Sequence, residues 1–134
     1  MADWVAQLRK GLVEFCILAV VGQEQTYGYR LLQRLQDLPP LGFTEGSVYR
    51  ALGRLIDAGL VRVTTRCSSL GPPRRYLSLT ADGRQRLTHM RTYWLRVGAS
   101  IEALMGDAGA SGRRGATETP AATRVVPTPR RRSP

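Results

Sequence analysis

Histidine, cysteine and lysine are scarce in this sequence, and basic residues outnumber acidic ones two to one. The 134 residues include one histidine, two cysteines and ten acids against twenty basic residues, nineteen of which are arginine. Two cysteines and one histidine cannot build a disulfide framework or a metal cluster. The net charge of +10 indicates a polyanionic partner, and nucleic acid fits it better than an acidic membrane surface.

Long apolar runs are also missing. The longest, residues 12–21, has ten residues and contains Glu14, which is far short of the roughly 20 that a membrane-spanning helix needs. The N-terminal segment MADWVAQLRKG lacks the basic, apolar and small-residue regions of a secretory signal. We therefore expect a cytoplasmic protein with no membrane partner. The length of 134 residues suits one domain and a tail.

No group of residues points to catalysis. The single histidine, His89, has no partner at the spacing of a metal site or a nucleophile–base pair, and the acids are scattered. The glycine patterns GxGxxG and GxxxxGK of phosphate-binding loops do not occur. The sequence predicts a protein that is not an enzyme and that uses no cofactor and no metal.

Composition changes sharply after Met105. Residues 106–134 are rich in Gly, Pro, Ser, Thr and Ala and show no periodic apolar pattern, which predicts a disordered tail. The tail contributes +4 to the net charge, and residues 1–104 contribute +6. The basic character therefore belongs to the predicted folded part as well as to the tail.

Four helices and one β-hairpin are predicted ahead of the tail. The helices cover approximately residues 5–21, 27–37, 45–59 and 81–105, and Thr26, Thr44 and Thr80 are expected to cap the last three. Alternating residues at 60–66 and 75–79, with a Gly-Pro-Pro turn at 71–73, predict two strands. This order is that of a mainly α winged helix-turn-helix with a small β-hairpin wing. Residues 1–79 would form the DNA-binding domain, and residues 80–105 a long C-terminal helix.

The third predicted helix has a polar face suited to a DNA major groove. Gly46 and Ser47 are small enough for a close backbone approach, and the free N–H groups of a helix that begins after Thr44 attract phosphate. Arg50 and Arg54 lie one turn apart and can reach phosphates or a guanine edge, and Tyr49 can donate to a phosphate. The alternative is an ordinary solvated helix face. The basic hairpin that follows favours DNA.

Arg74 and Arg75 follow the predicted turn of the hairpin. There they would place positive charge on the edge of a wing, over the DNA backbone or the minor groove. The alternative is a solvated pair at the start of a strand.

Several segments resemble the PadR-type transcriptional regulators. They are RKGLVEFCILAVV (9–21), TYGYRLLQRL (26–35), TEGSVYRALGRLIDAGLV (44–61) and GPPRRYLSLTADGRQRL (71–87), in the order of that family. The resemblance covers about residues 8–104 and is closest to the subgroup with a short C-terminal helix. It implies a dimeric winged-helix repressor whose recognition helix begins at Thr44 and whose Tyr49 lies near the DNA backbone. The arginine-rich tail is not part of the family pattern.

The last predicted helix carries an apolar seam. Its members follow one another at spacings of three and four residues, which is the pattern of a helix that packs against another helix. They are Leu87, Met90, Trp94, Val97, Ile101 and Leu104. A second subunit would cover this seam; the alternative is packing of the helix onto its own domain. The family resemblance implies the dimer.

Trp94 is the candidate effector-binding residue. The resemblance implies that two tryptophans, one from each subunit, sandwich a flat aromatic ligand, and an indole ring suits such stacking. The alternative is that Trp94 only fills the interface.

Together these features predict a cytoplasmic homodimeric repressor that binds double-stranded operator DNA and is released by a small aromatic effector. Two alternatives stay open. The winged helix could dock onto an acidic protein, or the arginine-rich tail could drive nonspecific DNA binding.

Overall fold

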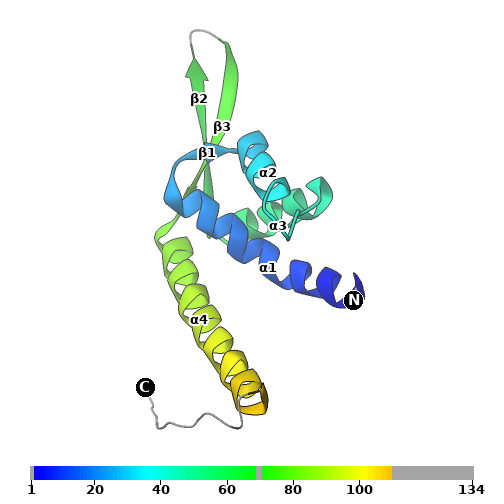
Figure 1. The fold of residues 1–134 in the computed structure, drawn as a ribbon. Helices are drawn as coiled ribbons and strands as arrows, with labels where there is room; N and C mark the ends of the chain where they lie inside the picture. The colour runs from blue at the N-terminus through cyan, green and yellow to red at the C-terminus, as the bar shows by residue number, and fades with distance from the viewer. Residues whose placement is uncertain (1, 69–70, 110–134) are drawn as a thin grey trace. The chain divides into compact units, whose positions relative to one another are not determined.

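The computed structural model describes residues 2–68 and 71–109 (Figure 1). The elements are α1 (Ala2–Gln23), β1 (Thr26–Tyr27), α2 (Gly28–Gln36), α3 (Glu45–Asp57), β2 (Val61–Ser68), β3 (Gly71–Leu79) and α4 (Ala81–Gly109). The predicted mainly helical fold with a β-hairpin is confirmed, and the sheet has one strand more than predicted. In the described part of the chain, no helix is long and apolar enough to cross a membrane.

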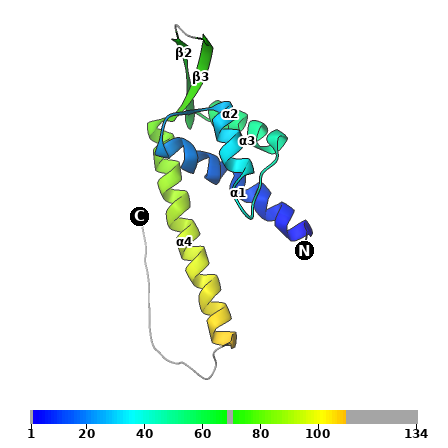
Figure 2. The ribbon, with the colours of Figure 1, turned by 45° about the horizontal axis from the view of Figure 1, so that its top comes forward.

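The chain divides into two compact units at a point inside α4. The first unit ends at Arg91, and the second begins at Thr92. In the first unit, α2 and α3 lie beside α1, and the β2–β3 hairpin projects beyond the helices (Figures 1 and 2).

One hydrophobic core joins the helices and the sheet of the first unit. The buried side chains of α2, α3 and β3 include Leu31, Leu32, Leu35, Val48, Leu55, Leu77 and Leu79. Ile17 and Leu18 of α1 are completely inaccessible to solvent. Burial of these side chains, at about 25 cal/mol per Å² of apolar surface, is the main force that fixes α3 against α1.

The sheet has the strand order β1–β3–β2, and both pairs are antiparallel. Thr26 pairs with Leu77, and Tyr27 pairs with Tyr76. The prediction that Thr26 caps the second helix is therefore wrong: Thr26 is a buried strand residue. The N-cap position is Tyr27, whose side chain makes no capping hydrogen bond.

The Gly-Pro-Pro segment at residues 71–73 lies in β3 rather than in the predicted turn. Its prolines fall where the register with β2 shifts, between the pairs Arg66–Arg74 and Ser68–Gly71. Proline lacks the N–H that a regular ladder needs, so an irregular position of this kind accommodates it.

Two of the predicted helix caps are confirmed. The Thr44 hydroxyl accepts a hydrogen bond from the backbone N–H of Ser47 at 3.3 Å, and the Thr80 hydroxyl accepts one from that of Gly83 at 2.9 Å. Helix α4 continues to Gly109, beyond the predicted end near Met105. Residues 110–134, most of the predicted tail, lie outside the described residues.

Candidate nucleic-acid interface

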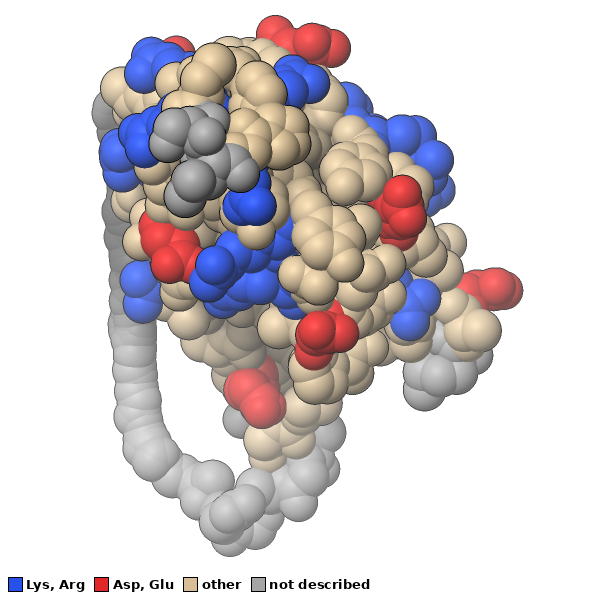
Figure 3. Space-filling view, turned by 90° about the horizontal axis from the view of Figure 1, so that it is seen from above, with Lys and Arg blue, Asp and Glu red and all other residues tan. Residues whose placement is uncertain are grey.

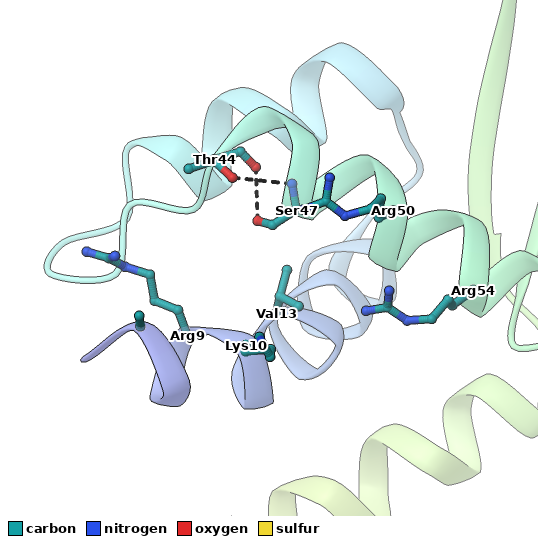
Figure 4. Close-up of a pocket in the computed structure, with 8 residues that line it drawn as sticks. Arg9, Lys10, Val13, Thr44, Ser47, Arg50 and Arg54 are labelled. Carbon is teal, nitrogen blue, oxygen red and sulfur yellow. Dashed lines mark hydrogen bonds between the residues drawn. The ribbon is translucent and has the colours of Figure 1, made fainter. Parts of the chain in front are cut away.

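Helix α3 presents the predicted polar face to solvent. Thr44, Gly46, Tyr49, Arg50 and Arg54 are exposed. The half-buried Ser47 also donates its hydroxyl hydrogen to the Thr44 carbonyl at 3.1 Å, which tightens the first turn (Figure 4). The opposite face of α3 is buried in the core. The helix is thereby fixed with its basic side outward.

A pocket of about 410 Å³ lies between α1 and the exposed side of α3. Two cations line it from each helix: Arg9 and Lys10 from α1, and Arg50 and Arg54 from α3 (Figure 4). Ala6, Val13, Thr44 and Ser47 complete the lining. Sequence reasoning missed Arg9 and Lys10, because their proximity to α3 depends on how the two helices pack.

The four cations of this pocket differ in what holds them. The Nε–H of Arg54 donates to a carboxylate oxygen of Glu14 at 2.9 Å, and the Nε–H of Arg9 donates to the Leu41 carbonyl at 2.6 Å. Lys10 and Arg50 form no ion pair with any residue that the structure describes. Among the described residues, Glu14 is thus the one carboxylate that forms an ion pair with a cation of this pocket.

Two glycines lie close to side chains of α3. A Cβ atom added to Gly46 would lie 3.1 Å from a terminal nitrogen of Arg50, so the glycine leaves room for that guanidinium. A Cβ on Gly28, the first residue of α2, would meet the ring of Tyr49 at 3.7 Å. By contrast, a Cβ on Gly53 would meet no described atom within 4 Å apart from those of the adjacent turns of α3.

On one face of the sheet, two neighbouring tyrosine rings are each covered by an arginine. The Arg74 guanidinium lies 4.6 Å from the centre of the Tyr27 ring, and that of Arg66 lies 5.3 Å from the centre of the Tyr76 ring. The two tyrosine rings meet edge to face, with 5.9 Å between their centres. Sequence reasoning missed Tyr27, Arg66 and Tyr76, because only the strand pairing brings them together.

Arg74 and Arg75 are both exposed, but they point to opposite faces of the sheet, since successive strand residues alternate. The two predicted wing contacts thus lie on different surfaces. Seen from above, basic side chains gather in patches with separate acidic groups between them (Figure 3).

The predicted seam of α4 divides into two parts. Leu87 and Met90 are partly buried against the core of the first unit, so this end of α4 packs onto its own domain. In the second unit, Trp94 is 46%, Ile101 50% and Leu104 71% exposed. Val97 is half-buried.

Metal-binding groups or reactive thiols among the described residues would be possible signs of catalysis. No group of three His, Cys, Asp or Glu residues among them could hold a metal ion. Burial raises the pKa of the Cys16 thiol, which keeps this sulfur protonated and weakly nucleophilic at neutral pH.

The family model described as "Transcriptional regulator PadR-like family" matches residues 17–89, more than half of the chain. The chain belongs to this family. The predicted family resemblance is thereby confirmed.

Solved structures of PadR-like proteins share the fold. A PadR-like transcriptional regulator from Bacillus cereus is 35% identical, with a TM-score of 0.67, and the match covers 74% of this chain and 96% of that protein. A Streptococcus transcriptional regulator is 32% identical, with a TM-score of 0.66 and coverages of 74% and 97%. Bacillus subtilis PadR, solved in complex with operator DNA, is 18% identical, with a TM-score of 0.53 and coverages of 59% and 46%. No curated protein matches the sequence.

The PadR-like fold brings the predicted recognition residues together on one helix. It also adds two basic residues from α1 beside them. The predicted wing arginines lie on the β3 strand of the same unit.

Proposed function

We propose that this PadR-like regulator is a homodimeric repressor that binds operator DNA and is released by a small aromatic effector. The observation that carries the DNA-binding part is the exposed face of α3. It presents Arg50 and Arg54 on a helix whose opposite face is locked into the core. In the proposed complex, residues 44–54 enter the major groove.

The wing supplies the second DNA contact in this proposal. Arg74 stacks on Tyr27, which limits the conformations open to its guanidinium while leaving N–H donors for phosphate. Arg75 reaches the DNA from the other face of β3. Such contacts position the protein on DNA without reading its sequence. The B. subtilis PadR that shares this fold was solved with operator DNA, the class of ligand proposed here.

The dimer is proposed from the exposed apolar residues of the second unit. Trp94, Ile101 and Leu104 continue the seam beyond the part that packs on the chain's own core. An apolar surface of this regularity on a long helix favours a second helix as its cover. A two-fold dimer would present two recognition helices to successive major grooves, about 34–36 Å apart.

Trp94 is proposed as the effector contact, since its indole is 46% exposed on this same seam. An effector acts only if it prefers one arrangement of the two recognition helices over another. In a Trp94→Ala variant, aromatic compounds that release wild-type protein from DNA should lose that effect. Normal release from the variant would leave Trp94 with a packing role only.

The remaining parts of the proposal follow from a regulator of this kind. We propose that the protein acts in the cytoplasm, has no catalytic activity and uses no cofactor. Its partners are operator DNA, a second copy of the chain and the aromatic effector.

The decisive experiment is fluorescence anisotropy with DNA from the upstream region of the protein's own gene and with a scrambled duplex, at about 150 mM salt, where nonspecific electrostatic binding is weak. A preference of ~10³-fold or more for the upstream DNA supports sequence-specific binding. Equal affinity for this duplex, for other genomic fragments and for scrambled DNA would favour nonspecific electrostatic binding. Absence of DNA binding would favour a protein-docking module.

A further inference from the structure

The pocket between α1 and α3 contains basic residues that the recognition helix does not supply. We infer that Arg9 and Lys10 extend the DNA interface onto α1, and that the pocket seats a phosphate of the DNA backbone beside the groove that α3 enters. This inference rests on the proposed function and adds a contact to it. We call the pocket the phosphate seat.

The positive charges that line the phosphate seat favour the binding of an anion. Four cations line a volume of about 410 Å³, and Glu14 neutralises part of this charge through Arg54. Like charges held together repel one another, and a bound oxyanion relieves that repulsion. Lys10 is exposed and free of ion pairs within the described residues, so its ammonium group can turn toward a phosphate without losing a protein partner.

The hydrogen bond of Arg9 determines which of its nitrogens can bind a phosphate. Its Nε–H is committed to the Leu41 carbonyl, which ties α1 to the segment ahead of α3. The terminal nitrogens of the guanidinium keep their donors. Arg9 is thus a cation held in place by the fold, whereas Lys10 is the adaptable partner on its flexible stem.

The seat fits the DNA backbone better than a free small anion because it is continuous with the recognition surface. Arg50 and Arg54 line the seat and also form the exposed face of α3 (Figure 4). A duplex whose major groove holds α3 has its phosphate strands along the edges of that groove. One of these strands would pass over the seat.

Lys10 offers a clean test because it is the one lysine in the sequence. We compare Lys10→Gln, which removes the charge, with Lys10→Arg, which keeps it, and with Arg96→Gln, which removes a charge from an exposed residue outside the seat and the seam. Affinities for operator and scrambled duplex are measured across a salt series. Circular dichroism checks that each variant is folded.

Lys10→Gln should weaken binding several-fold to both duplexes, so that the preference for the operator stays the same. The slope of log affinity against log salt should become shallower by about 0.9 for each phosphate that the variant no longer neutralises. Lys10→Arg should bind like the wild type, and Arg96→Gln should keep the wild-type slope. Identical behaviour of Lys10→Gln and Arg96→Gln would overturn the inference.

A second measurement tests directly whether DNA covers the Lys10 side chain. An amine-reactive ester acylates the Lys10 side chain, and mass spectrometry follows the rate against an added reference peptide. Duplex DNA should slow this acylation several-fold, whereas inorganic phosphate at equal ionic strength should not. Protection by inorganic phosphate but not by DNA would identify a small-anion site and overturn the inference.

The two proposals fail in different ways. If wild-type protein does not distinguish operator from scrambled duplex but any duplex protects Lys10, sequence-specific repression fails and the phosphate seat stands. If wild-type protein prefers its operator and Lys10 stays unprotected, the seat alone fails.

Discussion

At the residue scale, the basic side chains of the interface differ in the interactions within the protein that they would lose on binding DNA. Arg54 would exchange its bond to Glu14, and Arg74 lies on the Tyr27 ring. The Arg54–Glu14 pair is partly exposed, and such pairs contribute only about 0–1 kcal/mol, so phosphate can replace the carboxylate easily. Arg50 has no such partner among the described residues. Of the two arginines on α3, Arg50 is therefore the one more directly available for a base edge.

Replacing Arg50 with alanine should abolish the preference for operator DNA while the protein stays folded. The side chain is exposed, so its removal opens no cavity, and alanine favours the helix. A bidentate arginine–guanine contact contributes ~1–3 kcal/mol of discrimination per site. Anisotropy with operator and scrambled duplexes measures the loss, and circular dichroism follows folding. Unchanged operator affinity would remove Arg50 from the interface.

Gly53→Ala should stabilise the protein and weaken DNA binding at the same time. Outside the adjacent turns of α3 itself, no atom of the described residues lies within 4 Å of the added methyl group, and alanine in place of a mid-helix glycine stabilises by about 1 kcal/mol. If DNA approaches the helix here, the methyl group obstructs it. Thermal unfolding and anisotropy on the same sample test both effects. A more stable variant with unchanged affinity would show that DNA stays away from Gly53.

Single residues were predictable where their environment is local. The cap at Thr44 and the polar face of α3 each depend on a few neighbouring positions. Arg9 and Lys10 lie more than thirty residues from Thr44 in the sequence, and only the packing of α1 against α3 brings them near. No periodic pattern within α1 identifies that contact.

At the element scale, the sequence predicted all four helices but not strand β1. Two residues are too few to show the alternation that identifies a strand. Thr26 also has the chemistry of a good helix cap, and its position just ahead of α2 made that interpretation reasonable. Pairing with Leu77 and Tyr76 draws the segment into the sheet, so a tertiary contact overrides the local preference. The same pairing places Tyr27 beneath Arg74.

The start of α4 should be sensitive to a single methyl group. Thr80 donates to the Gly59 carbonyl at 2.7 Å while it caps the helix, and a Cβ on Gly83 would overlap the carbonyl oxygen of Leu60. Because the backbone fixes the position of a Cβ and the carbonyl oxygen is itself a backbone atom, the clash cannot be relieved by a side-chain rotation. Gly83→Ala should destabilise the protein by about 1–3 kcal/mol, measured by urea unfolding. Gly53→Ala is the matched control, and equal stability of the two variants would contradict this packing.

At the scale of the whole molecule, the exposed seam of the second unit should decide the oligomeric state. Ile101 is 50% exposed in one chain, so Ile101→Glu would be tolerated by a monomer but would place carboxylates inside a dimer seam. We expect monomers in analytical ultracentrifugation and loss of operator affinity, because two half-sites then no longer act together. Ala99→Glu, exposed and outside the seam, should remain dimeric. A dimeric Ile101→Glu protein would place the interface elsewhere.

The distribution of charge over the whole chain allows specific and nonspecific DNA binding to be separated. Residues 110–134 carry six arginines and one glutamate, whereas the residues proposed to read bases lie on α3. A protein ending after Gly109 keeps α4 complete and should bind all DNA more weakly, with a smaller salt slope, since fewer counterions are released. Its preference for operator over scrambled duplex should be unchanged. Anisotropy at several salt concentrations measures both quantities, and a truncated protein that binds both duplexes equally would move sequence recognition from α3 to the C-terminal segment.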